Sequence, residues 1–131
     1  MKKAVVIGSI NMDVILKVDK IPKIGETKIA EEMKIVGGGK GANQAIAISR
    51  LGSSVCMVGK VGNDKFGGNL IDSLKDSGVD IKGIIVDEFN STGTAYITVD
   101  GIGENTIVVV PGSNSSLSTK DIDGKKRNHM R

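Results

Sequence analysis

The stretch VGGGKGANQAIAI, from Val36 to Ile48, places three glycines and a lysine directly before a pattern typical of a helix. Glycine N–H groups at a helix start can cradle nucleotide phosphates, and a bare backbone can also form the hinge and pocket for a small polyhydroxy substrate. Lys40 adds three hydrogen-bond donors, and Asn43 adds donors and acceptors. The residue types therefore point to two ligand classes, nucleotides and polyols.

The two common nucleotide-binding motifs are absent from this glycine-rich chain. A Walker A loop reads G-x-x-x-x-G-K-[ST], but Gly41 follows Lys40 and the first glycine position falls on Lys34. A dinucleotide fingerprint, G-x-G-x-x-G directly after the first strand, is missing from IGSINMD. The run GIGENT from Gly101 lacks the last glycine. Both nucleotide motifs are excluded as written.

A polyol site has candidate residues in two places. Asn11 and Asp13 lie just past the first predicted strand, and parallel sheets bind ligands beyond the carboxyl ends of their strands. With Lys40 and Asn43 they form a polar set suited to sugar hydroxyls. In the alternative interpretation, Asp13 and Asn43 cap turns or helices and the glycines form a tight turn. The residues alone leave both interpretations open.

Composition and charge favour one soluble globular domain of 131 residues, with 39% hydrophobic and 25% charged residues. The net charge of +3 depends on the last residues, where Lys125, Lys126, Arg127 and Arg131 carry four positive charges, so the rest of the chain is at −1. Basicity confined to one end does not indicate a nucleic-acid partner.

Targeting signals and metal motifs are not recognised. The apolar run after Met1 is too short for a signal peptide, and no run approaches the roughly 20 residues that span a membrane, so we expect no membrane association and a cytoplasmic location. Cys56 is the single cysteine and is predicted to pack as a small hydrophobe. His129, the single histidine, lies in the basic C-terminal tail, where no cysteine or second histidine accompanies it to bind a metal.

Strand and helix patterns alternate along the chain. Apolar runs predict strands at residues 3–9, 12–18, 27–36 and 53–62. Helices are predicted at 41–52, closed by Gly52, and at 63–78, with Asp64 as N-cap and Gly78 at the end. TAYITV and NTIVVV flank DGIGE, which predicts a hairpin. The order predicts an α/β fold with a mostly parallel sheet and an antiparallel appendage.

The C-terminal segment begins like a helix. Ser118 and Thr119 precede Asp121, but no apolar periodicity follows, so no helix is predicted to continue there. We expect the natural chain to extend further. Residues 124–131 are predicted to form a disordered or non-native basic tail.

Two long segments, SINMDVILKVDKIPKIGET and GGGKGANQAIAISRLGSSVCMVGKVGND, resemble the start of the ribokinase-like (PfkB-type) carbohydrate kinases. The first signature of that family is matched by Gly38, Gly39, Asn43, Ala45, Gly52 and Gly62. Within the family the diglycine stretch is most similar to that of the ribokinases, because fructokinase-like relatives have Ala-Pro in place of Lys40-Gly41. The resemblance extends to about Asp123.

The resemblance implies a Rossmann-type, mostly parallel sheet with helices and a small antiparallel β lid, here truncated. Residues 1–123 would be the N-terminal part of this domain. The lid strands would come from about 13–36 and 93–110, and would pair with a second subunit in a homodimer.

The family's substrate positions can be carried over by resemblance. Asn11 and Asp13 would hold sugar hydroxyls, and Gly38 would be the hinge partner of the diglycine segment. The implied substrate-binding set is Asn11, Asp13, Gly38, Gly39, Lys40, Asn43, Ala95 and Ile97, the last two covering the sugar with apolar surface.

By the same resemblance, the activity would be phosphorylation of D-ribose by ATP to give D-ribose 5-phosphate and ADP. The catalytic base aspartate, the Gly-rich helix start, and the sites for ATP, Mg²⁺ and K⁺ would lie in a C-terminal half, so this chain is expected to hold no catalytic, cofactor or metal residue and to be inactive alone. The alternatives are another PfkB-type sugar or nucleoside kinase, and a non-catalytic module that binds a sugar or dimerises.

Overall fold

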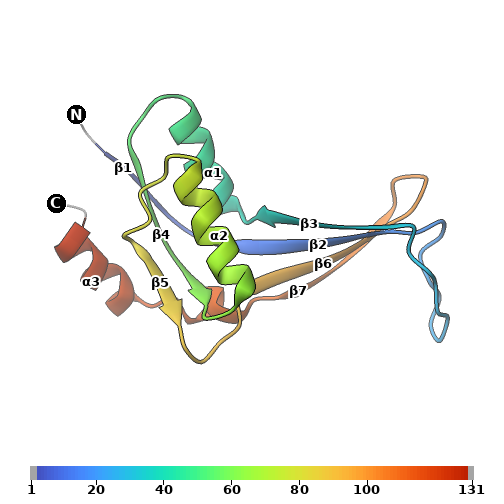
Figure 1. The fold of residues 1–131 in the computed structure, drawn as a ribbon. Coiled ribbons are helices and arrows are strands. Elements are labelled where there is room, and N and C mark those ends of the chain that lie inside the picture. The colour runs from blue at the N-terminus through green and yellow to red at the C-terminus, as the bar shows by residue number, and fades with distance from the viewer. Residues whose placement is uncertain (1–2, 130–131) are drawn as a thin grey trace.

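The computed structural model describes residues 3–129, and side chains as far as 125. In this range the chain forms a compact α/β body from which a four-stranded sheet extends to one side (Figure 1). The mixed α/β architecture with a parallel sheet in the body confirms the predicted fold class.

The core sheet of the body has three parallel strands in the order β1-β4-β5: β1 Ala4–Ile7, β4 Val55–Gly62 and β5 Ile84–Asp87. Helix α1, Lys40–Arg50, and helix α2, Lys65–Asp76, pack on one side of it. β4 is buried almost throughout because it lies between the other two strands, as its continuous apolar run predicts. Cys56 is fully buried in this strand, as expected.

The three predicted helix ends, at Asp64, Gly78 and Gly52, are confirmed. Asp64 caps α2 by accepting a hydrogen bond from Gly67 N at 2.8 Å. Gly78, with φ +85°, follows the last turn of α2, and Gly52, with φ +90°, follows that of α1. The helices place their apolar residues against the core sheet, where the buried cluster includes Ile10, Ala45, Met57, Leu70 and Leu74.

The lid sheet has the strand order β3-β2-β6-β7. Its strands are β2 Asn11–Lys17, β3 Glu32–Gly38, β6 Gly93–Val99 and β7 Asn105–Val110. Its two outer pairs are antiparallel, but β2 and β6 run parallel, so the lid is mixed rather than antiparallel throughout. The parallel pair is possible because a long crossover, which includes β3 and the helices and strands of the body, connects β2 to β6, whereas β6 and β7 are joined by a short turn.

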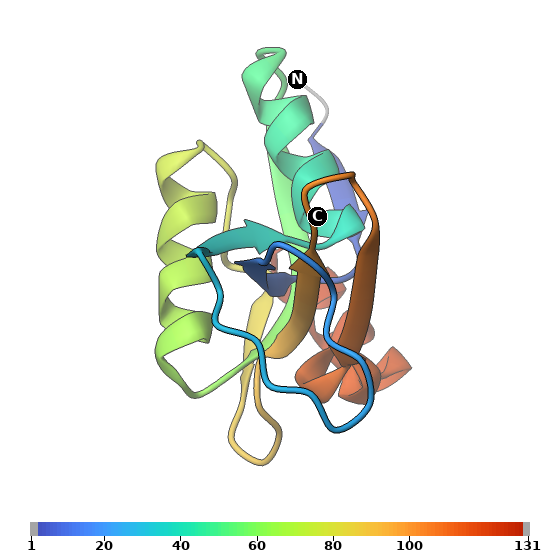
Figure 2. The ribbon, with the colours of Figure 1, turned by 90° about the vertical axis from the view of Figure 1, so that its right-hand side faces the viewer.

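The two faces of the lid sheet differ in their neighbours. One face, here called the Asp13 face, carries Asn11, Asp13, Ala95 and Ile97. The opposite face, here called the Tyr96 face, meets α2 at its base, where a Cβ on Gly37 would lie 3.2 Å from Leu70 Cδ2. Figure 2 shows the lid sheet end-on, with α2 beside it.

The C-terminal segment forms a 3-10 helix, η1 Gly112–Ser116, and helix α3 Thr119–His129. The expectation that no helix continues after Ser118 is wrong. Ser118 and Asp121 cap α3 reciprocally, because Ser118 N donates to Asp121 Oδ2 at 3.0 Å and Asp121 N donates to Ser118 Oγ at 3.3 Å. The predicted disordered tail is helical in residues 124–129, and residues 130–131 lie outside the described range.

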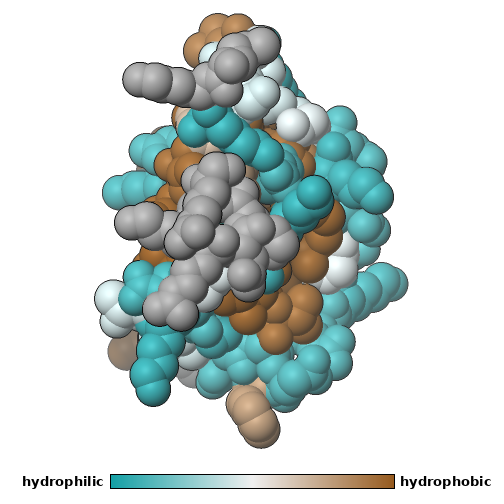
Figure 3. Space-filling model, turned by 90° about the vertical axis from the view of Figure 1, so that its left-hand side faces the viewer, coloured by the Kyte–Doolittle hydropathy of each residue, from teal (hydrophilic) through white to brown (hydrophobic). Residues whose placement is uncertain are grey.

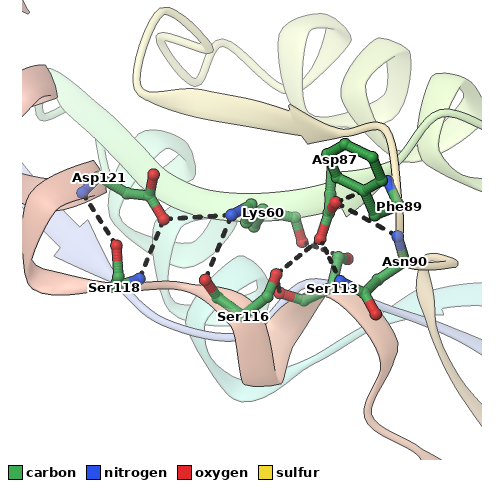
Figure 4. Close-up of polar contacts among 8 residues, drawn as sticks. All are labelled: Lys60, Asp87, Phe89, Asn90, Ser113, Ser116, Ser118 and Asp121. Atoms are coloured by element: carbon green, nitrogen blue, oxygen red, sulfur yellow. Dashed lines mark hydrogen bonds and ion pairs between the residues drawn. The ribbon is translucent and has the colours of Figure 1, made fainter.

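A polar network attaches η1 and α3 to the core sheet (Figure 4). Lys60 Nζ on β4 donates to Ser116 O and to Asp121 Oδ2, both at 3.2 Å. Ser116 Oγ donates to Asp87 Oδ2 on β5 at 2.6 Å, and this bond is the main reason why the pKa of Asp87 is far below its ordinary value. The sequence of α3 has few apolar residues that could pack against the core sheet. This polar network attaches the helix to the sheet instead.

The side of the core sheet opposite α1 and α2 exposes apolar residues. Val5 and Ile7 on β1 are 40% and 49% exposed. Figure 3, which views the molecule from the left-hand side of Figure 1, shows hydrophobic surface among hydrophilic side chains. None of the described helices is long and apolar enough to cross a membrane.

Candidate functional site

The first residues of β2 form the polar end of the site. Strand alternation puts Asn11 and Asp13 on the same face of the lid sheet. Asn11 is opposite Gly38 on one side and Gly93 on the other, and Asp13 is opposite Val36 and Ala95. The lid sheet thus brings together four of the predicted residues, Asn11, Asp13, Gly38 and Ala95.

The Asp13 carboxylate lacks protein hydrogen-bond partners among the described residues of this site. It is partly buried, and no described residue gives it a hydrogen bond or an ion pair. Burial raises its pKa above the ordinary value. A partly dehydrated carboxylate without a protein donor is suited to accept hydrogen bonds from a ligand.

Gly38 makes room for that carboxylate. A Cβ at Gly38 would lie 2.6 Å from Asp13 Oδ2, so a larger residue would displace the acid. Gly38 is itself buried, and it is the last residue of β3. Its absent side chain therefore leaves room for Asp13, and the hinge role that the resemblance implied stays a prediction.

Gly39 and Gly41 let the start of α1 lie against the connection between β1 and β2. Gly39, the N-cap, has φ +94°, and a Cβ there would lie 2.7 Å from Ser9 O and 3.0 Å from Asn11 N. A Cβ at Gly41 would lie 2.8 Å from the Gly8 Cα. Ala42 N completes the contact by donating to Ser9 O at 3.0 Å. These glycines therefore form the close backbone approach of a tight turn, and their contact with a ligand stays a prediction.

Lys40 and Asn43 lie in the first turn of α1 with exposed side chains. The Gly39 and Ala42 contacts hold this turn next to the start of β2. Neither side chain makes a hydrogen bond to a residue in the described range. Asn43 does not act as a helix cap, because Gly39 holds that position. Their role in binding stays a prediction.

An apolar wall continues from the polar end along the Asp13 face. Ala95 is 6% exposed beside Asp13, and Ile97 follows two residues further on β6. Three residues outside the predicted set share this wall, namely Val36, Ile107 and Val109, which are 42%, 56% and 55% exposed. Strand alternation and the pairing of Val109 with Ala95 could have identified the last two. A hollow of about 170 Å³ lies further along the same face, lined by Ile15, Lys17, Glu32, Lys34, Val99 and Asp100.

Sequence reasoning also missed Asn114, which reaches the site from η1. Its Nδ2 donates to Asn11 Oδ1 at 2.6 Å. The two residues are 103 positions apart, and no local pattern marks Asn114, so its contact is visible only in the folded chain.

The chain matches the pfkB family carbohydrate kinase domain over residues 1–129. A ribokinase of Bacillus subtilis is 44% identical over 118 residues, which is 90% of this chain and 40% of that protein. A deoxyribokinase of Salmonella typhi is 42% identical and covers 90% of this chain and 39% of its own length. The structure of an Arabidopsis thaliana ribokinase complexed with ribose and ATP is 32% identical, with a TM-score of 0.84 over 94% of this chain and 42% of that one.

The chain therefore belongs to the pfkB family of carbohydrate kinases, as the signature residues indicated. Members of this family are phosphotransferases. Within the family the curated relatives include ribokinases of bacteria, a slime mould and the mouse. The chain spans about 40% of the length of the relatives compared above.

Proposed function

We propose that this chain is the sugar-binding and lid portion of an ATP-dependent carbohydrate kinase whose substrate is D-ribose. The observation that carries the proposal is the Asp13 carboxylate, partly buried, without a protein hydrogen-bond donor, and given room by Gly38. The pfkB match and the ribokinase relatives support the reaction class, phosphoryl transfer to a sugar, and the proposed acceptor is the terminal hydroxyl of ribose.

The proposed chemistry of binding follows from the polar end of the Asp13 face and from the apolar wall beside it. A sugar hydroxyl donates to the Asp13 carboxylate, and the side chains of Asn11, Lys40 and Asn43 supply donors and acceptors to other hydroxyls. Ala95 and Ile97 cover the C–H surface of the sugar and exclude water from it. A polar end beside an apolar wall is the arrangement that a pentose, polar at its rim, requires.

The described residues do not fit ATP or a divalent cation. They contain no group of three or more His, Cys, Asp or Glu side chains able to hold a metal ion. At the Gly-rich start of α1, Ala42 N already donates to Ser9 O. We therefore propose that this chain binds and orients the sugar. The base, the phosphate cradle and the Mg²⁺ and K⁺ sites would belong to a longer polypeptide, and the 131 residues alone would not phosphorylate ribose.

Two alternatives remain as outcomes of the test. The 42% identity to a deoxyribokinase favours a second pentose as substrate, and the family also includes nucleoside and fructose kinases of known structure. The other alternative is a non-catalytic module that binds a sugar or dimerises through the lid sheet.

The test is calorimetric titration of the 131-residue chain with ribose, 2-deoxyribose, fructose and adenosine, with a parallel assay for ADP formation from ATP, Mg²⁺ and ribose. We expect ribose to bind most tightly, and we expect no ADP above background. Tightest binding of another ligand would replace the ribose assignment, and binding of none would contradict the sugar-binding proposal. ADP formation by this chain would contradict the proposal that the catalytic groups belong to a longer polypeptide.

A further inference from the structure

Asn114 makes three hydrogen bonds at the point where the chain enters β2. Its Oδ1 accepts from Ile10 N at 3.0 Å, and its Nδ2 donates to Ile10 O at 3.1 Å and to Asn11 Oδ1 at 2.6 Å. Ile10 is fully buried, so its backbone groups have few alternative partners. One side chain from η1 thus serves as the pairing partner of Ile10 and as a neighbour of Asn11.

The backbone of Ile10 determines which way the Asn114 amide points. Ile10 N can only donate and Ile10 O can only accept, so Asn114 must present Oδ1 to the first and Nδ2 to the second. The second hydrogen of that Nδ2 is then available to Asn11. The Asn11 side chain accepts this hydrogen bond through its oxygen, Oδ1. As a consequence, the Asn11 Nδ2 is the group left free for a ligand.

Gly93 leaves space for this arrangement. It lies opposite Asn11 in the β2–β6 pair, and a Cβ there would lie 2.7 Å from Asn11 Oδ1 and would overlap Asn114 Nδ2. The glycine therefore permits the two amides to meet beside the strand. The Asn114–Asn11 hydrogen bond therefore requires a glycine at position 93 as well as an amide at position 114.

We propose that Asn114 is a positioning residue that holds Asn11 as a hydrogen-bond donor to the sugar, next to Asp13 as an acceptor. This inference rests on the proposed sugar site and adds which of its side chains donates a hydrogen bond and which accepts one. A donor and an acceptor two residues apart on one strand select a ligand with neighbouring hydroxyls, one giving its hydrogen to Asp13 and one receiving a hydrogen from Asn11. Asn114 itself does not touch the sugar.

The deciding variant is Asn114→Asp in the full 131-residue chain. A carboxylate still accepts from Ile10 N but can donate neither to Ile10 O nor to Asn11, so the Asn11 amide has to turn its Nδ2 towards position 114 and its oxygen towards the ligand. We expect ribose affinity to fall about tenfold, because one hydrogen bond to the sugar is lost. Ser115→Ala, at an exposed neighbour in the same 3-10 helix, serves as control and should leave the affinity unchanged.

A double-variant cycle separates positioning from general damage. If Asn114 acts through Asn11, Asn114→Asp has little further effect on ribose affinity in an Asn11→Ala background. An equal loss in both backgrounds would mean that Asn114 only supports the fold, and would overturn the proposal. Gly93→Ala provides a second route to the same displacement, and should likewise lose its effect on ribose affinity when Asn11 is already alanine.

A measurement without sugar keeps this inference separate from the proposed function. In ¹⁵N spectra, the Asn11 side-chain amide protons should be open to solvent in the parent chain and shift on bonding to a carboxylate in Asn114→Asp. Unchanged Asn11 signals would overturn the positioning role even if ribose binds. Shifted Asn11 signals in a chain that binds no sugar would support the role of Asn114 and contradict the sugar site.

Discussion

Single residues of the candidate site have one of two roles. The glycines leave room for neighbouring groups, and a few polar side chains are available for hydrogen bonds. By resemblance Gly39 was predicted to lie in the pocket segment, with Gly38 as its hinge partner. In the structure Gly38 accommodates the Asp13 carboxylate and Gly39 accommodates the backbone of Ser9. The chemistry resides in the few side chains left without protein partners, above all Asp13. Such a carboxylate stays partly dehydrated in the folded chain, which lowers stability, and under the proposed function a sugar hydroxyl would offset that cost.

Asp13→Asn should stabilise the chain at neutral pH and weaken ribose binding. Because burial raises the folded-state pKa of Asp13, the folded chain binds more protons than the unfolded chain, and stability falls as pH rises through that range. The variant should therefore melt at a higher temperature than the parent at pH 7. The difference should disappear below about pH 3.9, where aspartate is protonated in both states.

Thermal melts at both pH values test this, with Asp72→Asn, at an exposed position of α2, as the matched control. A lower melting temperature for Asp13→Asn at pH 7, or unchanged ribose affinity, would contradict the assignment of Asp13.

At the scale of elements, the start of α2 and the start of β6 are held by one carboxylate. Asp64 accepts from Gly67 N and also from Thr92 N at 2.9 Å and Thr92 Oγ1 at 2.6 Å. Burial raises the pKa of Asp64, but these hydrogen bonds outweigh it, and the pKa lies below the ordinary value. Since Thr92 directly precedes the first residue of β6, the helix cap also anchors the base of the lid sheet.

Asp64→Ala should lower the free energy of unfolding by about 2 kcal/mol, from the lost cap and the buried Thr92 groups left without a partner. Urea unfolding measures this, and Asp72→Ala in the same helix should change stability by less than about 0.5 kcal/mol. Equal effects of the two variants would show that the Asp64–Thr92 connection contributes nothing to stability.

At the scale of the whole molecule, the lid sheet exposes apolar side chains on both faces. On the Tyr96 face Met33 is 61%, Ile35 47% and Val108 65% exposed. An extended sheet with exposed apolar faces and open edge strands favours pairing with another copy. We propose that the lid sheet is the surface through which this chain self-associates, in line with the homodimer that the family resemblance implies.

Val108→Lys should therefore shift the chain towards monomer, because a charge in the centre of an apolar interface is costly to desolvate. Sedimentation velocity over a concentration series measures the shift. Ile24→Lys, a fully exposed apolar residue in the β2–β3 connection, provides the control and should associate like the parent. If both variants associate like the parent, the interface lies elsewhere, and the exposed apolar side of the core sheet becomes the next candidate.

Much of the fold was determined by local patterns in the sequence. Asp64, Gly52 and Gly78 mark helix ends because capping and positive φ depend on neighbouring residues only. The hairpin around DGIGE was predicted for the same reason. The helix after Ser118 was missed because the segment lacks apolar periodicity and because the contact of its Asp121 with Lys60 joins residues 61 positions apart.

The sequence alone also determined the family and the residue types of the site, since Asn11, Asp13 and the glycines lie within contiguous signature segments. Only the tertiary structure decided the parallel pairing of β2 with β6, the steric role of Gly38, and the contact between Asn114 and Asn11. These depend on the register between strands and on residues 103 positions apart. No local pattern encodes such distances, because they are determined by how the whole chain packs.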